Sequence, residues 1–197
     1  MSSSEPIQVW VLNDGRAGHF NQTRAIVMAL GRHYPVQSTT LQCSLRAGLW
    51  QWPLRRWLNA RSGQLPASLL RLTHRLEPLP DCQPDLIVSA GGHTRFVNAV
   101  LARQKNCPNL FCGQTRGLRD ELFTGILTAY PGHETDPRYI FSSTPVPIEP
   151  AELAKSGAAL RERAQLGQAR LWSLLVGGDG AGYRYTEADW RALAAGL

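Results

Sequence analysis

Residues 7–30, IQVWVLNDGRAGHFNQTRAIVMAL, place a short polar loop between two apolar segments. The first segment, residues 7–13, is mostly apolar and has the length of a strand, whereas the residues from Asn21 to about Gly31 follow a helical pattern. A strand that is apolar at successive positions is typical of a parallel sheet covered on both faces. This stretch therefore predicts the first strand and helix of a βαβ unit, with the polar loop at the carboxyl end of the strand.

The same alternation of strand and helix continues along the chain. Further apolar segments of strand length occupy residues 36–43, 85–90, 109–113, 125–130 and 138–143. The segment that follows Gly91 and Gly92 has a helical pattern, and alternating strands and helices indicate right-handed βαβ crossovers. The predicted fold is therefore α/β, a Rossmann-like parallel sheet with helices on both faces. In such a sheet a ligand is expected at the carboxyl edge of the strands.

A proline-rich segment, STPVPIEP at 143–150, marks the edge of this predicted domain. A charged, alanine-rich helix is expected after it, and then an apolar strand, a glycine-rich loop and the start of another helix. We expect residues 1–168 to form an N-terminal Rossmann-like domain, with a basic insertion at 44–76 and a connector at 143–168. Residues 169–197 are expected to begin a second Rossmann-like domain. One strand and one helix cannot bury their own faces, so we expect a fragment of a longer protein, with little or no activity by itself.

The composition is that of an ordinary globular protein. The chain has 197 residues, of which 43% are hydrophobic and 18% charged. The amino terminus has no signal-peptide pattern, and no apolar run approaches the roughly 20 residues that span a bilayer. The four cysteines form no CxxC pair and lie near no histidine cluster. A cytoplasmic protein with reduced thiols and no bound metal is therefore expected.

Positive charge is concentrated in one part of the sequence. Between Gly15 and Leu76 there are nine arginines and no acidic residue, whereas the whole chain has a net charge of +6. Such a block attracts phosphate, anionic lipid or nucleic acid. Within it, tryptophans and arginines alternate in a way that suits two interpretations: a helical insertion that packs its tryptophans on the domain, or a peripheral contact with an anionic inner membrane. The candidate membrane-contact residues are Trp50, Trp52, Arg55, Arg56 and Trp57. Nucleic acid is not a predicted partner, because no motif that reads bases accompanies the charge.

The first polar loop has the chemistry of an anion-binding or catalytic site. Unpaired backbone N–H groups at a helix N-terminus favour an anion, and Arg16 adds a fork of donors. His19 is the side chain here that can exchange a proton near neutral pH. Asn21 is a natural N-cap. The alternative interpretation is a tight turn with an asparagine cap and a surface histidine.

Two further loops follow predicted strands in the same way. The second contains Gly91, Gly92 and His93, with Thr94 as a possible cap, and the third contains Gln114 and Arg116. Because the carboxyl ends of parallel strands meet at one edge, the three loops are expected to face one crevice. His93 also suits a purely structural role, and Arg116 also suits a buried ion pair.

The order of these loops resembles the mitochondrial-fission, elongated-mitochondria family and its bacterial members. The most specific part of the resemblance is the motif formed by Asp14, Gly15, Arg16, Gly18, His19, Asn21 and Gln22. The layout is also similar to the two-domain GT-B glycosyltransferases, particularly the peptidoglycan GlcNAc transferase, in which glycine-rich turns occupy the positions of Gly18-His19 and Gly91-Gly92-His93. A glycine pair in its second domain matches Gly177-Gly178. This resemblance implies that residues 1 to about 168 are the acceptor-side half of a GT-B-like architecture.

The resemblance implies a glycosyltransferase-like protein that moves a sugar from a nucleotide-diphosphate sugar to an acceptor, which a membrane could hold. His19 is the candidate catalytic base, and no cofactor or metal is implied. The candidate residues for substrate and phosphate are Asp14, Gly15, Arg16, Gly18, Asn21, Gln22, Gly91, Gly92, His93, Thr94, Gln114, Arg116, Gly177 and Gly178. The alternative is a non-catalytic, membrane-associated recruitment or scaffold protein. An NAD-dependent epimerase is less favoured, because no GxGxxG motif follows the first strand. No oligomeric state is predicted.

Overall fold

The structure, a computed structural model, describes residues 5–133, 135–170 and 184–196. The chain divides into two compact units, Met1–Glu149 and Pro150–Leu197. The second unit contains helices α5 (Pro150–Arg163) and α6 (Glu187–Ala195). The strand predicted to open a second domain, together with Gly177 and Gly178, lies outside the described residues.

The first unit is built on a seven-stranded sheet with the order β3-β2-β1-β4-β5-β6-β7. Its strands are β1 (Ile7–Asn13), β2 (Val36–Leu45), β3 (His74–Leu76), β4 (Leu86–Ala90), β5 (Asn109–Cys112), β6 (Gly125–Thr128) and β7 (Tyr139–Phe141). All neighbouring pairs are parallel except β2 and β3, which are antiparallel. The predicted α/β fold with a Rossmann-like sheet is therefore confirmed. The short edge strand β3 was not predicted.

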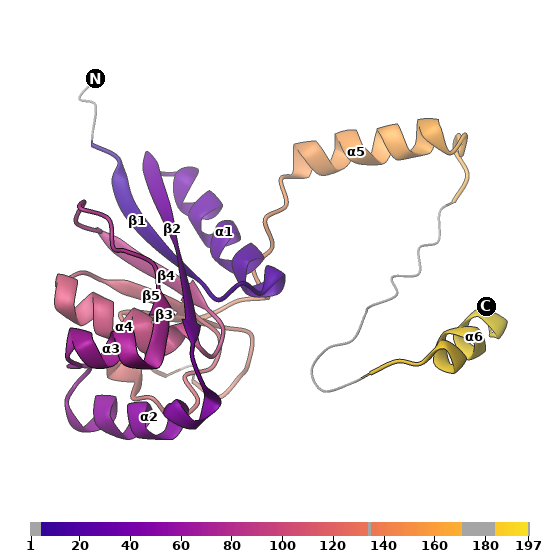
Figure 1. The fold of residues 1–197 in the computed structure, drawn as a ribbon. Coiled ribbons are helices and arrows are strands. Elements are labelled where there is room, and N and C mark those ends of the chain that lie inside the picture. The colour runs from indigo at the N-terminus through magenta and orange to yellow at the C-terminus, as the bar shows by residue number, and fades with distance from the viewer. Residues whose placement is uncertain (1–4, 134, 171–183, 197) are drawn as a thin grey trace. The chain divides into compact units, whose positions relative to one another are not determined.

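Helices cover both faces of the sheet, as predicted (Figure 1). They are α1 (Ala17–Gly31), α2 (Gln51–Ala60), α3 (Ala67–Thr73) and α4 (Thr94–Lys105), with short 3-10 turns at Gly48–Trp50 and Asp120–Leu122. Alternate side chains of β1 point to opposite faces. Trp10 and Leu12 pack with α2, α3 and α4 in the larger core, and Val9 and Val11 pack with α1 in the smaller one. None of the described helices is long and apolar enough to cross a membrane.

The basic insertion packs on the domain through leucines. Leu54 and Leu58 of α2 and Leu70 of α3 are fully buried in the larger core. The tryptophans play a smaller part, because Trp50 is only partly buried against this core and Trp52 is 62% exposed. Buried leucines thus hold the insertion against the sheet, whereas Trp52 faces solvent.

Two predicted helix caps are wrong. Helix α1 begins at Ala17 with Arg16 at the N-cap, so Asn21 lies inside the helix and is exposed. The earlier start follows from the turn before it, where the Gly15 N–H donates to Asn13 Oδ1 at 2.9 Å and the Arg16 N–H donates to Asp14 Oδ1 at 3.2 Å. Thr94 likewise does not cap α4. Its buried hydroxyl donates to the backbone carbonyls of Ala90 and Gly91, each at 2.9 Å.

Candidate functional site

The candidate site lies at the point in the sheet where successive strands of the chain change from being added on one side of β1 to being added on its other side. Strand β1 is followed by β2 on one side, whereas β4, the next parallel strand, pairs with β1 on the other side. At such a point the two helices that follow the strands diverge, and the loops at the strand ends leave a crevice. The first and second polar loops follow β1 and β4 respectively, so the topology brings them together.

His19 and Asp14 form a close pair at this point. His19 Nδ1 lies 2.8 Å from Asp14 Oδ2 and 3.1 Å from Oδ1, and the Asp14 side chain is only 2% exposed. Burial raises the pKa of Asp14, but the hydrogen bonds from His19 and from the Arg16 amide, with the nearby positive charges, outweigh it and hold this pKa below its ordinary value. Asp14 is therefore an ionised carboxylate at neutral pH, and it accepts a hydrogen bond from His19.

This pair determines which nitrogen of His19 is available for chemistry. An ionised carboxylate only accepts hydrogen bonds, so Nδ1 carries a proton toward Asp14 and Nε2 of the neutral ring carries a lone pair. Within the described part of the chain, no hydrogen bond engages Nε2. An imidazole oriented in this way by a carboxylate has the chemistry that a general base requires.

Gly91 makes room for the histidine. Its φ of +89° lies in the left-handed region, and a Cβ at this position would collide with the His19 ring at Nδ1, Cε1 and Cγ. The ring therefore lies directly against the backbone of the second loop. This contact joins the first two loops, as the sequence predicts.

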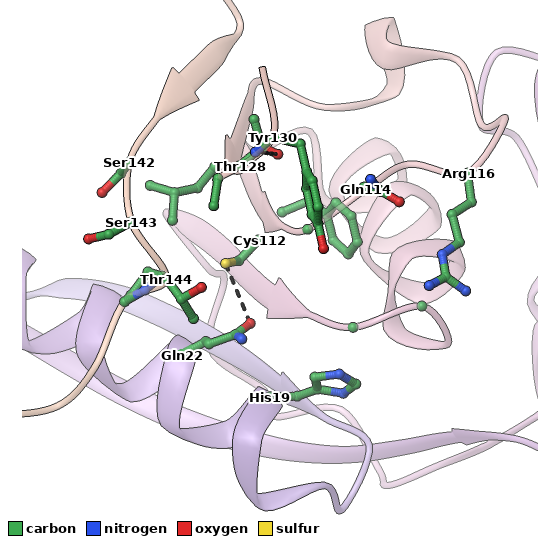
Figure 2. A pocket seen from close by; sticks show the side chains of 17 residues that line it. His19, Gln22, Cys112, Gln114, Arg116, Thr128, Tyr130, Ser142, Ser143 and Thr144 are labelled. Carbon is green, nitrogen blue, oxygen red and sulfur yellow. Dashed lines mark hydrogen bonds between the residues drawn. The ribbon is translucent and has the colours of Figure 1, made fainter. Parts of the chain in front are cut away.

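His19 lines a pocket of about 230 Å³ at the carboxyl edge of the sheet (Figure 2). The lining comes from α1, from the loops after β4 and β5, and from the chain after β6 and β7. Its polar members are His19, Gln22, Gln114, Arg116, Thr128, Tyr130, Ser142, Ser143 and Thr144. Arg116 points from the third loop toward the space that His19 also faces, and the Cys112 thiol donates to Gln22 Oε1 at 3.5 Å. The third predicted loop thus reaches the same pocket.

The other candidates from the sequence lie around this pocket or away from it. Gly91 and Gly92 line it, whereas Gly15, Arg16, Gly18 and Asn21 are exposed beside it. His93 is outside the lining, and burial and the positive charge of Arg16 lower its pKa. Its ring is therefore neutral at neutral pH.

The candidate membrane-contact residues differ in their surroundings. Trp52, Arg56 and Trp57 are exposed on α2, whereas Arg55 is partly buried against Gly117. None of them lines the pocket.

Sequence reasoning missed some groups at this edge of the sheet. Ser142, Ser143 and Thr144 lie where the predicted strand at 138–143 meets the proline-rich segment at 143–150, and they were not predicted as site residues, yet they form one wall of the pocket. Arg95, at the second position of α4, is buried, although a single arginine in a helical pattern is normally assigned to the surface. No pattern in the sequence marks it. In the described ranges, no group of three or more His, Cys, Asp or Glu residues could hold a metal ion.

Comparison with known proteins gives one match. The family model described as "Mitochondrial fission ELM1" matches residues 17–197. The match includes His19 and Gln22, and it begins just after Asp14, Gly15 and Arg16. No curated protein and no solved structure matches the chain.

Proposed function

The chain belongs to the Mitochondrial fission ELM1 family, and from the geometry of its pocket we propose that it is the acceptor-side part of a sugar-transferring protein. The family is the one that the strand-end loops resemble in sequence. The donor in this proposal is a nucleotide-diphosphate sugar, and the acceptor carries a hydroxyl group. The observation that carries the proposal is the buried Asp14 carboxylate that orients His19 at the edge of a pocket.

In the proposed reaction, His19 acts as the general base. The acceptor hydroxyl gives its proton to His19 Nε2 while its oxygen bonds to the anomeric carbon of the sugar. The bond between that carbon and the diphosphate oxygen breaks, and the nucleoside diphosphate leaves with the electron pair. Asp14 stabilises the imidazolium that forms, through the hydrogen bond to Nδ1.

The size of the pocket favours the acceptor end of this reaction. Its volume of about 230 Å³ is below the roughly 300–1,000 Å³ of pockets that enclose a whole drug-sized ligand. A nucleotide-diphosphate sugar therefore needs further protein surface, which a second Rossmann-like domain would supply in a GT-B-like arrangement. Gln22, Gln114 and the hydroxyl groups of the pocket wall suit an acceptor rich in hydroxyls.

The test is an assay of sugar transfer by the protein as the cell makes it. A panel of nucleotide-diphosphate sugars is supplied, and the release of nucleoside diphosphate is measured. Loss of a positioned base lowers kcat by roughly 10²–10⁴-fold, and we expect a loss in this range for His19→Ala. The matched control is His33→Ala, because His33 is exposed beyond the far end of α1. Equal turnover in the two variants would reject the assignment of His19 as the base.

A membrane-associated recruitment protein is the second candidate, favoured by one observation on α2. Leu49, in the 3-10 turn just before α2, and Trp52 on α2 are 71% and 62% exposed, and Arg56 follows at the spacing that continues the same helical face. Apolar and basic side chains that share a helical face suit the surface of an anionic bilayer. If no nucleotide-diphosphate sugar is turned over or bound in calorimetry, this second function stands in place of transfer.

A further inference from the structure

Arg95 is a buried cation for which the described part of the chain provides no carboxylate and no hydrogen-bond acceptor. The residue is 3% exposed, and its Nε is fully buried and makes no hydrogen bond. No carboxylate pairs with it among the described residues, and its guanidinium lies 4.5 Å from the centre of the Phe96 ring. Burying a charge without hydrogen bonds or a counter-ion costs stability, so an unpaired buried arginine needs an explanation.

Two other arginines approach Arg95 and add to this cost. Burial, together with the smaller effect of the positive charges of Arg116 and Arg55, lowers the pKa of Arg95 to about 10. Arg116 has a φ of +49°, a backbone conformation that residues other than glycine rarely adopt. The charges of Arg116 and Arg55 thus act on Arg95 in the unfavourable direction, and ionisable groups perturbed by burial and by neighbouring charges cluster at functional sites.

Two glycines allow this gathering. A Cβ on Gly92 would lie 3.0 Å from Arg95 Nη1, and a Cβ on Gly117 would lie 3.2 Å from both Cδ and Nη1 of Arg55. Arg95 is therefore held against the second loop, and Arg55 against the third. Gly92 and Arg116 both line the pocket of His19, so the arginines stand at its edge.

We propose that Arg95, Arg116 and Arg55 form a binding site for a diphosphate group at the edge of the His19 pocket. Guanidinium groups bind phosphate oxygens through two parallel N–H bonds, and several such forks suit a diphosphate better than a single phosphate. The N-terminus of α4, which carries Arg95 at its second position, adds a favourable dipole. The inference rests on the proposed transfer reaction, in which the diphosphate of the donor lies beside the base. It assigns the binding of this diphosphate to Arg95, Arg116 and Arg55.

The experiment is isothermal titration calorimetry of the whole chain with inorganic pyrophosphate. We expect binding that weakens by roughly tenfold or more in Arg95→Met, which keeps the aliphatic volume and removes the charge. Arg116→Gln is expected to weaken binding in the same way. The matched control is Arg103→Gln, which removes an exposed charge from the far end of the same helix.

Thermal unfolding of the same variants separates a binding role from a structural one. Removing an uncompensated buried charge relieves its cost, so Arg95→Met is expected to keep or raise the Tm while it loses pyrophosphate. A purely structural arginine would show the opposite result, a lower Tm with unchanged binding. Should Arg95→Met fail to fold, Arg116→Gln decides the outcome, because Arg116 is exposed.

Two further titrations identify the source of the diphosphate. Uridine diphosphate represents the nucleotide, and a short-chain prenyl diphosphate represents a lipid-linked acceptor. Tighter binding of either probe, lost in Arg95→Met, supports the site and names the source. Absence of pyrophosphate binding, or equal affinities in Arg95→Met and Arg103→Gln, overturns it. Pyrophosphate binding without any sugar transfer would retain this site and reject the proposed reaction, so the two failures are distinguishable.

Discussion

At the scale of single residues, Gly91 sets the position of the candidate base. Alanine at this position combines an unfavourable φ of +89° with a collision against the His19 ring. We therefore expect Gly91→Ala to lower the free energy of unfolding by about 1–3 kcal/mol. Gly18→Ala is the control, because a Cβ at this helical position meets no atom within 4 Å, and it is expected to stabilise α1 by about 0.5–1 kcal/mol. Urea unfolding followed by tryptophan fluorescence measures both, and equal effects would contradict the packing described.

The Asp14 carboxylate gives stability a defined dependence on pH. Its pKa in the folded protein lies below the ordinary carboxyl value, so its contribution is complete above about pH 4 and is lost as the pH falls through the lower folded pKa. We expect Asp14→Asn to cost about 1–3 kcal/mol at pH 7, and we expect the difference from the unsubstituted protein to shrink below pH 4.

Urea unfolding at a series of pH values tests this expectation. The control is Asp81→Asn, which changes an exposed carboxylate that makes no hydrogen bond within the described residues, and it should alter the unfolding free energy by less than about 0.5 kcal/mol. A difference for Asp14→Asn that stays constant from pH 7 to pH 3 would mean that the carboxylate is not held by His19 as the structure indicates.

At the scale of elements, α2 carries the predicted membrane contact. Trp52→Ala removes the most exposed aromatic ring of α2. Arg56→Glu reverses a positive charge that is worth about 1 kcal/mol at an anionic surface. We therefore expect binding to anionic vesicles to fall roughly fivefold or more in each variant. Co-sedimentation with phosphatidylglycerol-containing vesicles measures the bound fraction. Arg24→Glu on α1, which packs on the opposite face of the sheet (Figure 1), is the matched control. Equal loss in Arg24→Glu and Arg56→Glu would show that only net charge matters.

The elements also show what the sequence can and cannot predict. The parallel strands are recognisable because their burial on both faces requires continuous apolar runs, which periodicity detects. Strand β3 (His74–Leu76) is too short for any pattern, and it depends on pairing with the end of β2. The start of α1 was missed because its turn is closed by Asn13 and Asp14, which are ordinary loop residues in the sequence.

At the scale of the whole molecule, the order of the sheet explains why part of the candidate site is predictable. His19, Gln22, Gly91 and Arg116 follow parallel strands, and every such strand delivers its loop to one edge. The burial of Arg95 was not predictable, and the charged side chains that act on it, Arg55 and Arg116, come from segments distant from it in the sequence. Contacts between distant segments of this kind have no signature in local sequence.

The first unit contains the His19 pocket and the three arginines of the proposed diphosphate site. Every residue described as buried lies within Met1–Glu149, and so does the whole pocket lining. Stability of a domain comes mainly from burial of apolar surface, so residues 1–149 are expected to unfold cooperatively by themselves, with a Tm within about 3 °C of the whole chain. A shortened chain that ends at Glu149 keeps the surface ion pair between Glu149 and Arg32, and an exposed pair of this kind contributes little to stability. Calorimetry measures the unfolding of the shortened and the whole chain. Pyrophosphate affinities of the two chains that agree within twofold would confirm that the anion site belongs to this unit. A shorter chain without a cooperative transition would instead mean that residues beyond 149 complete its core.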